Sequence, residues 1–426
     1  MRILLLTMGT RGDVQPFVAL GKRLRQAGHE VAVCASSGFA PWIKEHGLGY
    51  AYMNNDILDL VNSDAGRRAM EGAGGVADIP KRMLESARRF KPIFRRALAE
   101  QWEAAQGAQV IIYNPNAVGG YHIAEALGIV GIMTDAIPTW VPTSAFPHIV
   151  APDLKLGGWY NRLTHRFIGV IPRLLFGSVV SRWRKETLRL PPRPLFANEL
   201  IRADGRPVPV LLSISPHVVA PPPDWPKSVQ VTGYWFLDEG QSWQPPPRLL
   251  EFLDDGSPPI FVGFGSMVGR NPAKTARVTL DALAQSGQRG LIVTGWGGLS
   301  IPDPPQNAYV TEFIPYDWLL PRVAAVVHHG GAGTTAAGLR AGKPAVICPF
   351  VADQPFWGRR VADLGVGPSP IPQRNLTANN LARAIQEAVT DTRMRQRAAE
   401  LGAKIQAENG LRNAMGFIEE HVRAAA

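Results

Sequence analysis

The sequence contains little cysteine. Cys34 and Cys348 are the two cysteines in 426 residues, and each lies within a short apolar run. Two such residues give neither a disulfide framework nor the ligand spacing of a zinc site. We therefore expect both to be small, buried strand residues.

Long apolar runs and dense basic clusters are also absent. No stretch approaches the roughly 18 apolar residues of a membrane span, and the run Ile3–Leu6 is too short for a signal-peptide core. We expect a cytoplasmic protein and leave peripheral contact with a membrane open. The formal net charge is +10, yet the sequence has no run of five Lys/Arg and no nucleic-acid motif. Nucleic acid is therefore not expected as a partner, whereas a phosphate-bearing substrate or an acidic lipid surface fits the charge.

What the sequence does contain is the opening of a doubly wound α/β domain. Residues 2–7 predict a buried strand, and a glycine-rich turn, a helix over 16–27 and a strand over 30–35 follow. Further along, the apolar runs 110–113 and 129–133 predict strands of the same sheet, with a helix over 121–127 between them.

A second α/β domain is predicted after two proline-rich stretches, 221–226 and 245–247. Its first strand covers 259–264, and later strands are expected over 291–294, 308–310, 324–328 and 345–348. We predict two Rossmann-like, doubly wound domains that face each other across a cleft. The expected division is an acceptor-binding domain over 1–225, a linker over 226–250, a nucleotide-sugar-binding domain over 251–405 and a final helix over 406–426. Whether this helix packs back on the first domain stays open.

Residues 154–190 mix aromatic and aliphatic side chains with arginine and lysine. This composition predicts helices that have one apolar and one basic face. Such helices either pack on the first domain with a solvated basic face, or form an acceptor lid or a membrane-surface element.

The strongest chemical signal is the run His328-His329-Gly330-Gly331-Ala332-Gly333-Thr334-Thr335, which follows a strand and precedes a predicted helix over 335–341. Bare glycine backbone lets a ligand approach the amides at a helix start, where the helix dipole favours negative charge. An imidazole beside them can donate a further hydrogen bond. The pattern predicts a phosphate site, with a plain tight turn as the alternative.

Polar side chains also follow two other strands of the second domain. Ser266 comes after the strand over 259–264 and could bind the same phosphates; the alternative is a helix cap. Asp353 and Gln354 come after the strand over 345–348, and such a pair suits the hydroxyls of a sugar. For Asp353 the alternative is again a helix cap.

Asp13 follows the first strand, in the run Gly9-Thr10-Arg11-Gly12-Asp13-Val14. We expect it on a loop, where its carboxylate could take a proton from an attacking hydroxyl. The alternative is a helix N-cap.

These segments resemble the nucleotide-sugar glycosyltransferases of the GT-B fold, family 1. Within that family, the runs 9–16, 161–163, 182–188 and 328–358 are most similar to sterol 3β-glucosyltransferases and to bacterial glycosyltransferases that tailor antibiotics and glycolipids. Many members carry a ribose-binding glutamate on the helix after the phosphate loop, where this sequence has Ala337. Plant members often carry a catalytic histidine on the first loop.

The resemblance implies a role for each matching residue. Asp13 matches the general base, and Asp353 and Gln354 match the pair that holds the donor sugar. Trp296 and Val310 would lie near the nucleobase, by position alone. The expected diphosphate ligands are Ser266, His329, Gly331, Gly333 and Thr334.

The resemblance further implies inverting hexose transfer that needs neither a metal nor a cofactor besides the nucleotide-sugar co-substrate. The first choice is glucose from UDP-glucose to a sterol-like apolar acceptor, with Trp140 and Phe146 lining an apolar slot or merely packing. The alternatives are an antibiotic or polyketide aglycone with a dTDP- or UDP-sugar, a UDP-sugar epimerase, and a non-catalytic binding protein. The oligomeric state stays open.

Overall fold

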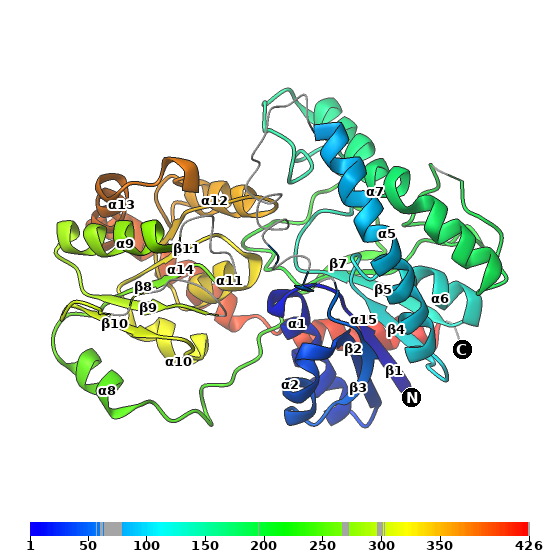
Figure 1. The fold of residues 1–426 in the computed structure, drawn as a ribbon, viewed down its shortest axis with the longest axis horizontal. Helices are drawn as coiled ribbons and strands as arrows, with labels where there is room; N and C mark the ends of the chain where they lie inside the picture. The colour runs from blue at the N-terminus through cyan, green and yellow to red at the C-terminus, as the bar shows by residue number, and fades with distance from the viewer. Residues whose placement is uncertain are drawn as a thin grey trace. The chain divides into compact units, whose positions relative to one another are not determined.

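The chain divides into two compact units. The computed structural model describes residues 1–56, 58–59, 63, 79–194, 196–265, 272–295, 301 and 303–424, with the backbone alone over 79–87. The N-terminal unit holds the described residues up to Leu237 and those from Asn409 onward, and the C-terminal unit holds Asp238–Glu408 (Figure 1).

The N-terminal unit is built on a parallel sheet. Among the described residues it has seven strands in the order β3-β2-β1-β4-β5-β6-β7, so the order reverses between β1 and β4. The central strands are apolar throughout because helices cover both faces of a parallel sheet. The strands are β1 (Arg2–Leu6), β2 (Glu30–Ser36), β3 (Gly49–Met53), β4 (Val110–Tyr113), β5 (Val130–Asp135), β6 (Val210–Leu212) and β7 (Val229–Val231). The helices are α1 (Arg11–Gln26), α2 (Ala40–Glu45), α5 (Ile79–Ala104), α6 (Gly119–Leu127), α7 (Gly158–Glu186) and α15 (Gly410–Arg423).

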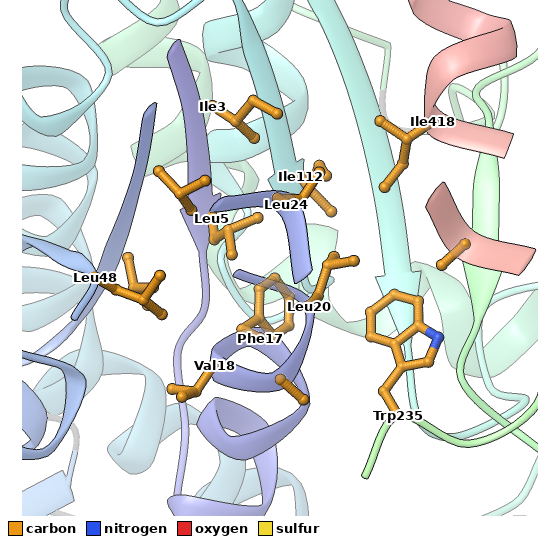
Figure 2. Close-up of a cluster of buried hydrophobic side chains, with 14 of the residues drawn as sticks. Ile3, Leu5, Phe17, Val18, Leu20, Leu24, Leu48, Ile112, Trp235 and Ile418 are labelled. Carbon is orange, nitrogen blue, oxygen red and sulfur yellow. The ribbon is translucent and has the colours of Figure 1, made fainter. Parts of the chain in front are cut away.

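Helix α15, from the end of the chain, packs into the core of this unit. Figure 2 shows Ile418 near Trp235, in one buried cluster with Phe17 and Leu20 of α1. Asn413 Nδ2 also donates to the carbonyl of Thr232 at 2.8 Å. Each fully buried side chain of this size contributes about 1.5–3 kcal/mol, so α15 stabilises the sheet to which it returns.

Helix α1 begins five residues earlier than we expected. We placed its start at Pro16, but it starts at Arg11, with Thr10 as the N-cap and Pro16 inside the helix. Thr10 and Asp13 form a capping box, in which the Thr10 backbone N–H donates to Asp13 Oδ2 at 2.7 Å. Asp13 is therefore a residue of the first helical turn, and its expected place on a loop was wrong.

The basic and aromatic segment forms one helix where several were expected. Helix α7 runs without a break over 29 residues, with Pro172 inside it. Among the described residues it is the one helix long and apolar enough to cross a membrane by length and composition. A single helix of this kind is weak evidence for a membrane span.

The C-terminal unit has a second parallel sheet. Its described strands are ordered β10-β9-β8-β11-β12, and the order reverses between β8 and β11. The predicted fold class of two parallel-sheet α/β domains is thus confirmed. The strands are β8 (Ile260–Gly263), β9 (Gly290–Val293), β10 (Ala308–Thr311), β11 (Ala325–His328) and β12 (Ala345–Ile347). The helices are α8 (Pro247–Asp254), α9 (Pro272–Ser286), α10 (Tyr316–Leu319), α11 (Ala332–Arg340), α12 (Gln354–Asp363), α13 (Ala378–Thr390) and α14 (Thr392–Ala407).

Two further features bear on the sequence expectations. The segment 226–250, expected as a linker, contributes strand β7 to the first sheet and the start of α8 to the second unit. Cys34 and Cys348 are both buried and unbonded to each other, as predicted, and burial raises the pKa of each thiol to about 12.

Candidate functional site

Three loops of the C-terminal unit lie together at the carboxyl ends of its strands. Strand β11 pairs with β8 and β12, so that His328 lies opposite Gly263 on one side and Ile347 on the other. The chain therefore leaves three neighbouring strands at one edge, where parallel α/β sheets bind ligands. A Cβ added to Gly295, after β9, would lie 3.0 Å from the Gly265 carbonyl oxygen, so Gly295 lies at the same edge of the sheet.

His328, the first residue of the histidine pair, shapes the loop after β11. Its buried ring accepts the Gly330 N–H at Nδ1, at 3.0 Å, and burial holds its pKa far below the usual value. Gly330 has φ of +90°, and a Cβ there would lie 2.7 Å from Ile347. His328 is thus a neutral side chain that fixes the turn. The positive φ and the lack of space for a Cβ at position 330 favour glycine there.

His329 lies between two glycine loops. A Cβ on Gly331 would come within 2.6 Å of its Nε2, and one on Gly265 within 3.1 Å of its Cε1. Burial lowers the pKa of His329 to about 4, although the Gly263 carbonyl acts in the opposite direction. At neutral pH the ring is uncharged and keeps one N–H, which is the hydrogen bond it can donate to a phosphate.

The first turn of helix α11 follows the His329 loop directly, at the same edge of the sheet. Gly331 is its N-cap, and the buried Thr335 closes the turn by donating from Oγ1 to the Gly331 carbonyl at 2.9 Å. The N–H groups of Ala332, Gly333 and Thr334 have no intrahelical acceptor, as is the case for the first N–H groups of any helix. Gly333 is exposed and Thr334 is partly exposed. The turn therefore presents backbone donors and the positive end of a helix dipole to an anion.

Asp353 and Gln354 lie at the start of α12, on the third loop. Asp353 Oδ2 accepts the Trp357 indole N–H at 2.9 Å, and burial raises the Asp353 pKa to about 6. Gln354 Oε1 accepts the Phe350 N–H at 2.8 Å, and its backbone carbonyl is close enough to Gly330 to meet an added Cβ at 3.1 Å. The structure thus brings this pair beside the histidine loop.

Two expected donor residues, Ser266 and Trp296, lie outside the described residues. The structure describes the residues just before them, Gly265 and Gly295, at this edge of the sheet. Val310 is partly buried on β10 and packs against the core of the unit. Its role near a nucleobase stays a prediction.

In the N-terminal unit, Asp13 lies at the carboxyl end of β1. Besides the Thr10 backbone N–H, the Thr10 hydroxyl contacts Asp13 Oδ2 at 3.2 Å, and the Thr7 hydroxyl donates to the Asp13 carbonyl at 3.0 Å. The carboxylate therefore has a fixed orientation. The spacing Thr-X-X-Asp signals a capping box, which sequence reasoning could have used.

Asn114, just after β4, holds the segment that leads to Asp13. Its buried Nδ2 donates to Thr7 Oγ1 and to the Met8 carbonyl, both at 3.1 Å. Its Oδ1 accepts the Met8 N–H at 3.3 Å and the Ala117 N–H at 3.0 Å. Sequence reasoning missed this residue; the available signal was a polar side chain directly after a buried strand.

The two expected acceptor residues lie in the loop region after β5. Trp140 is half-buried. The Phe146 ring packs against His165, at 6.3 Å, and Trp225, at 6.4 Å between ring centroids. Packing is therefore one function of Phe146, and an acceptor contact stays a prediction for both residues.

No group of three or more His, Cys, Asp or Glu side chains among the described residues is arranged to hold a metal ion.

Two family models match the chain. Residues 3–147 match the glycosyltransferase family 28 N-terminal domain, and residues 296–412 match the C-terminal domain of erythromycin biosynthesis protein CIII-like proteins. Together the two matches cover more than half of the chain. Both matches agree with the resemblance of the sequence to nucleotide-sugar glycosyltransferases.

Similar proteins agree with these matches. A sterol 3-beta-glucosyltransferase of Aspergillus oryzae is 37% identical over 98% of this chain, which spans 30% of that protein. The chain thus spans about a third of the length of the curated relatives it matches. The glycotransferase of kitacinnamycin has a TM-score of 0.72 at 18% identity, with 99% of both chains covered. The Streptomyces sp. SF2575 glycosyltransferase SsfS6, complexed with thymidine diphosphate, has a TM-score of 0.63 at 18% identity, again with 99% of both chains covered.

Proposed function

Because the chain belongs to the nucleotide-sugar glycosyltransferases of the GT-B fold, we propose that it transfers a hexose from a nucleoside diphosphate sugar to a sterol-like acceptor. UDP-glucose is the donor of first choice, and the transfer inverts the anomeric carbon. The observation that carries this proposal is the 37% identity, over 98% of the chain, with a protein named sterol 3-beta-glucosyltransferase. The solved structures, at 18% identity, support the fold alone.

The C-terminal unit binds the donor. The diphosphate lies against the first turn of α11, where the N–H groups of Gly333 and Thr334 and the ring of His329 donate to it. Negative charge on the diphosphate grows as the bond to the anomeric carbon breaks. Donors that are already in place stabilise that charge more than water does, commonly by several kcal/mol. Asp353 and Gln354, on the adjacent loop, hold hydroxyls of the sugar.

The N-terminal unit supplies the base. Asp13 takes the proton of the acceptor hydroxyl as its oxygen attacks the anomeric carbon, and the nucleoside diphosphate leaves from the opposite face. Thr10 holds Asp13 Oδ2 by its backbone N–H and its hydroxyl, so the carboxylate is oriented before the acceptor arrives. A positioned base of this kind contributes about 10²–10⁴-fold to the rate.

The test compares wild-type chain with Asp13→Asn, using UDP-glucose and a panel of sterols. Asparagine Oδ1 can still accept the Thr10 N–H, so the variant keeps its helix cap while it loses the base. We expect unchanged UDP binding by calorimetry and a loss of about 10²–10⁴-fold in transfer, measured by mass spectrometry of products. Asp363→Asn, an exposed aspartate on α12, is the matched control.

Two results would contradict the proposal. Near wild-type transfer by Asp13→Asn would show that Asp13 is not the base. Absence of transfer to every sterol would show that sterols are not the acceptor class. The panel therefore includes polyketide and peptide aglycones with dTDP-sugars, so that turnover of these in place of sterols identifies the alternative acceptor. Conversion of UDP-glucose without any acceptor would instead indicate an epimerase.

A further inference from the structure

The outer face of α7 carries a ridge of large apolar side chains. Phe167, Trp159 and Leu174 are about two-thirds exposed, at 67%, 66% and 64%, and Leu163 is 40% exposed. At 3.6 residues per turn these four side chains fall within a sector of about 80°. Single exposed apolar residues are normal on a soluble protein, whereas a contiguous row of them marks a surface that binds something.

The opposite face of α7 holds the helix to the N-terminal unit. Asn161 Nδ2 donates to the Ser144 carbonyl at 2.8 Å, and the Phe176 ring packs on Phe94 of α5 at 5.1 Å between centroids. A further anchor lies beside this face, near the end of the helix, where the buried Arg184 binds both carboxylate oxygens of Glu125, at 2.8 and 3.0 Å. Figure 1 shows α5 and α7 lying alongside each other. A helix that is anchored along one face in this way stays with its domain, so its apolar ridge can lie on a bilayer but does not cross one.

The charges along α7 are basic up to its last residue, Glu186. The sequence has no acidic residue between Asp153 and Glu186, but it has seven basic ones: Lys155, Arg162, Arg166, Arg173, Arg182, Arg184 and Lys185. Arg173 and Arg184 turn inward to Glu199 and Glu125. Arg162, which pairs with Asp224 and is still 64% exposed, and the exposed Arg166 lie along one side of the ridge, and Arg182 and Lys185 are exposed near its end.

We propose that this face of α7 docks on a membrane that contains anionic lipid. A bilayer surface offers apolar chains to the ridge and negative headgroups to the arginines beside it. The apolar and basic side chains of the helix are arranged to meet these two layers. Nucleic acid offers no apolar layer of this kind. The inference deepens the proposed function, because a sterol acceptor is a membrane lipid, and it assigns the surface through which that acceptor is reached.

The experiment is vesicle flotation of the full chain, which requires no transfer activity. The probes are phosphatidylcholine vesicles with and without phosphatidylserine. Wild-type chain should float with the anionic vesicles and much less with the neutral ones. The double variant Trp159→Ser/Phe167→Ser should lose at least tenfold in affinity, since it removes two exposed aromatic side chains. Arg166→Gln/Lys185→Gln should lose about fivefold for each charge removed.

Matched controls remove the same chemistry elsewhere. Tyr52→Ser/Leu250→Ser removes two exposed apolar side chains from β3 and α8, and Arg383→Gln/Arg393→Gln removes two exposed charges from α13 and α14. Both controls should float as wild type does, and all variants should keep the wild-type circular dichroism spectrum.

Three results would overturn the proposal: absence of flotation with any vesicle, wild-type flotation of Trp159→Ser/Phe167→Ser, or equal loss in the controls. If no vesicle is bound and the α7 variants instead abolish self-association in sedimentation, the face is a protein interface. A chain that floats as expected but glucosylates no sterol would defeat the proposed function and leave this inference standing. Transfer to detergent-dispersed sterol without any flotation would support the proposed function and defeat the membrane inference.

Discussion

The indole N–H of Trp357 donates to Oδ2 of Asp353 at 2.9 Å, across one turn at the start of α12. Two effects act on this carboxyl in opposite directions. Burial favours its neutral form and raises its pKa to about 6, while the Trp357 hydrogen bond favours the carboxylate. The side chain proposed to hold the donor sugar therefore changes its charge within the range in which enzymes are commonly assayed.

Donor affinity should fall below pH 6. A carboxylate accepts stronger hydrogen bonds from sugar hydroxyls than a neutral carboxyl group does. With a pKa of about 6, Asp353 is mostly ionised at pH 7 and mostly protonated at pH 5. We expect the KM for UDP-glucose to rise about tenfold between these values, as protonation removes the binding form.

Two variants check this assignment. Asp353→Asn should give a weaker but nearly pH-independent KM over the same range. Trp357→Phe removes the hydrogen bond that favours the carboxylate, so the midpoint of its profile should move to higher pH. An unchanged profile in Asp353→Asn would assign the titration to another group.

The space around His329 should be sensitive to one added methyl group. Gly331 has an extended backbone that alanine tolerates, yet its Cβ would come within 2.6 Å of His329 Nε2. We expect Gly331→Ala to displace the ring and to weaken UDP binding about tenfold or more, with a cost of about 1–3 kcal/mol in stability. Calorimetry with UDP and chemical unfolding measure the two effects.

A double-mutant cycle tests the cause of that loss. In a His329→Ala background the clash is absent, so Gly331→Ala should cost much less there than in the wild-type background. Gly416→Ala in α15, where a Cβ meets no atom within 4 Å, is the control and should bind UDP normally. Equal costs in both backgrounds would show that the ring is not the affected group.

Asn114 should act on catalysis through the segment that leads to Asp13. Asn114→Ala removes the four hydrogen bonds that its side chain makes with Thr7, Met8 and Ala117. We expect a loss of about 1–3 kcal/mol in the free energy of unfolding, because buried backbone groups are left without partners. The kcat should fall at temperatures where the variant is folded, while the KM for the donor should stay unchanged. The control is Asn116→Ala, because the Asn116 side chain makes one long contact of 3.5 Å with the Met8 carbonyl. This variant should change neither the free energy of unfolding nor the kcat.

The sequence pattern was sufficient for the sheets because buried parallel strands are short, unbroken apolar runs. Val110–Tyr113 and Ala325–His328 match their predicted positions within one residue. Strand β7 is half-buried and has Gln230 between two valines, so it forms no unbroken apolar run, and its place beside β6 depends on long-range pairing. The final helix showed its apolar periodicity, but no local pattern could say which core it joins.

The site was only partly predictable, for related reasons. A glycine run with adjacent histidines marks a ligand loop, so the His328–Thr335 region was found from its residues. The start of α1 was misplaced because Pro16 was taken as a first helical residue, whereas the helix starts at the capping box of Thr10 and Asp13. The contacts of Asn114 and Trp357 join residues that only the fold or the helix brings together. Neither residue has a partner that its own sequence neighbourhood identifies, although Asn114 is a polar side chain directly after a buried strand.

The most direct test of the account is the affinity for UDP of wild-type chain and His329→Ala, measured by calorimetry at neutral pH. His329→Ala removes a neutral donor from the diphosphate site and leaves the His328 turn intact. The account predicts UDP binding by the wild type, weakened about tenfold or more in the variant, since a hydrogen bond to a charged group contributes about 1.5–3 kcal/mol. Equal affinity in both proteins, or no UDP binding by the wild type, would contradict it.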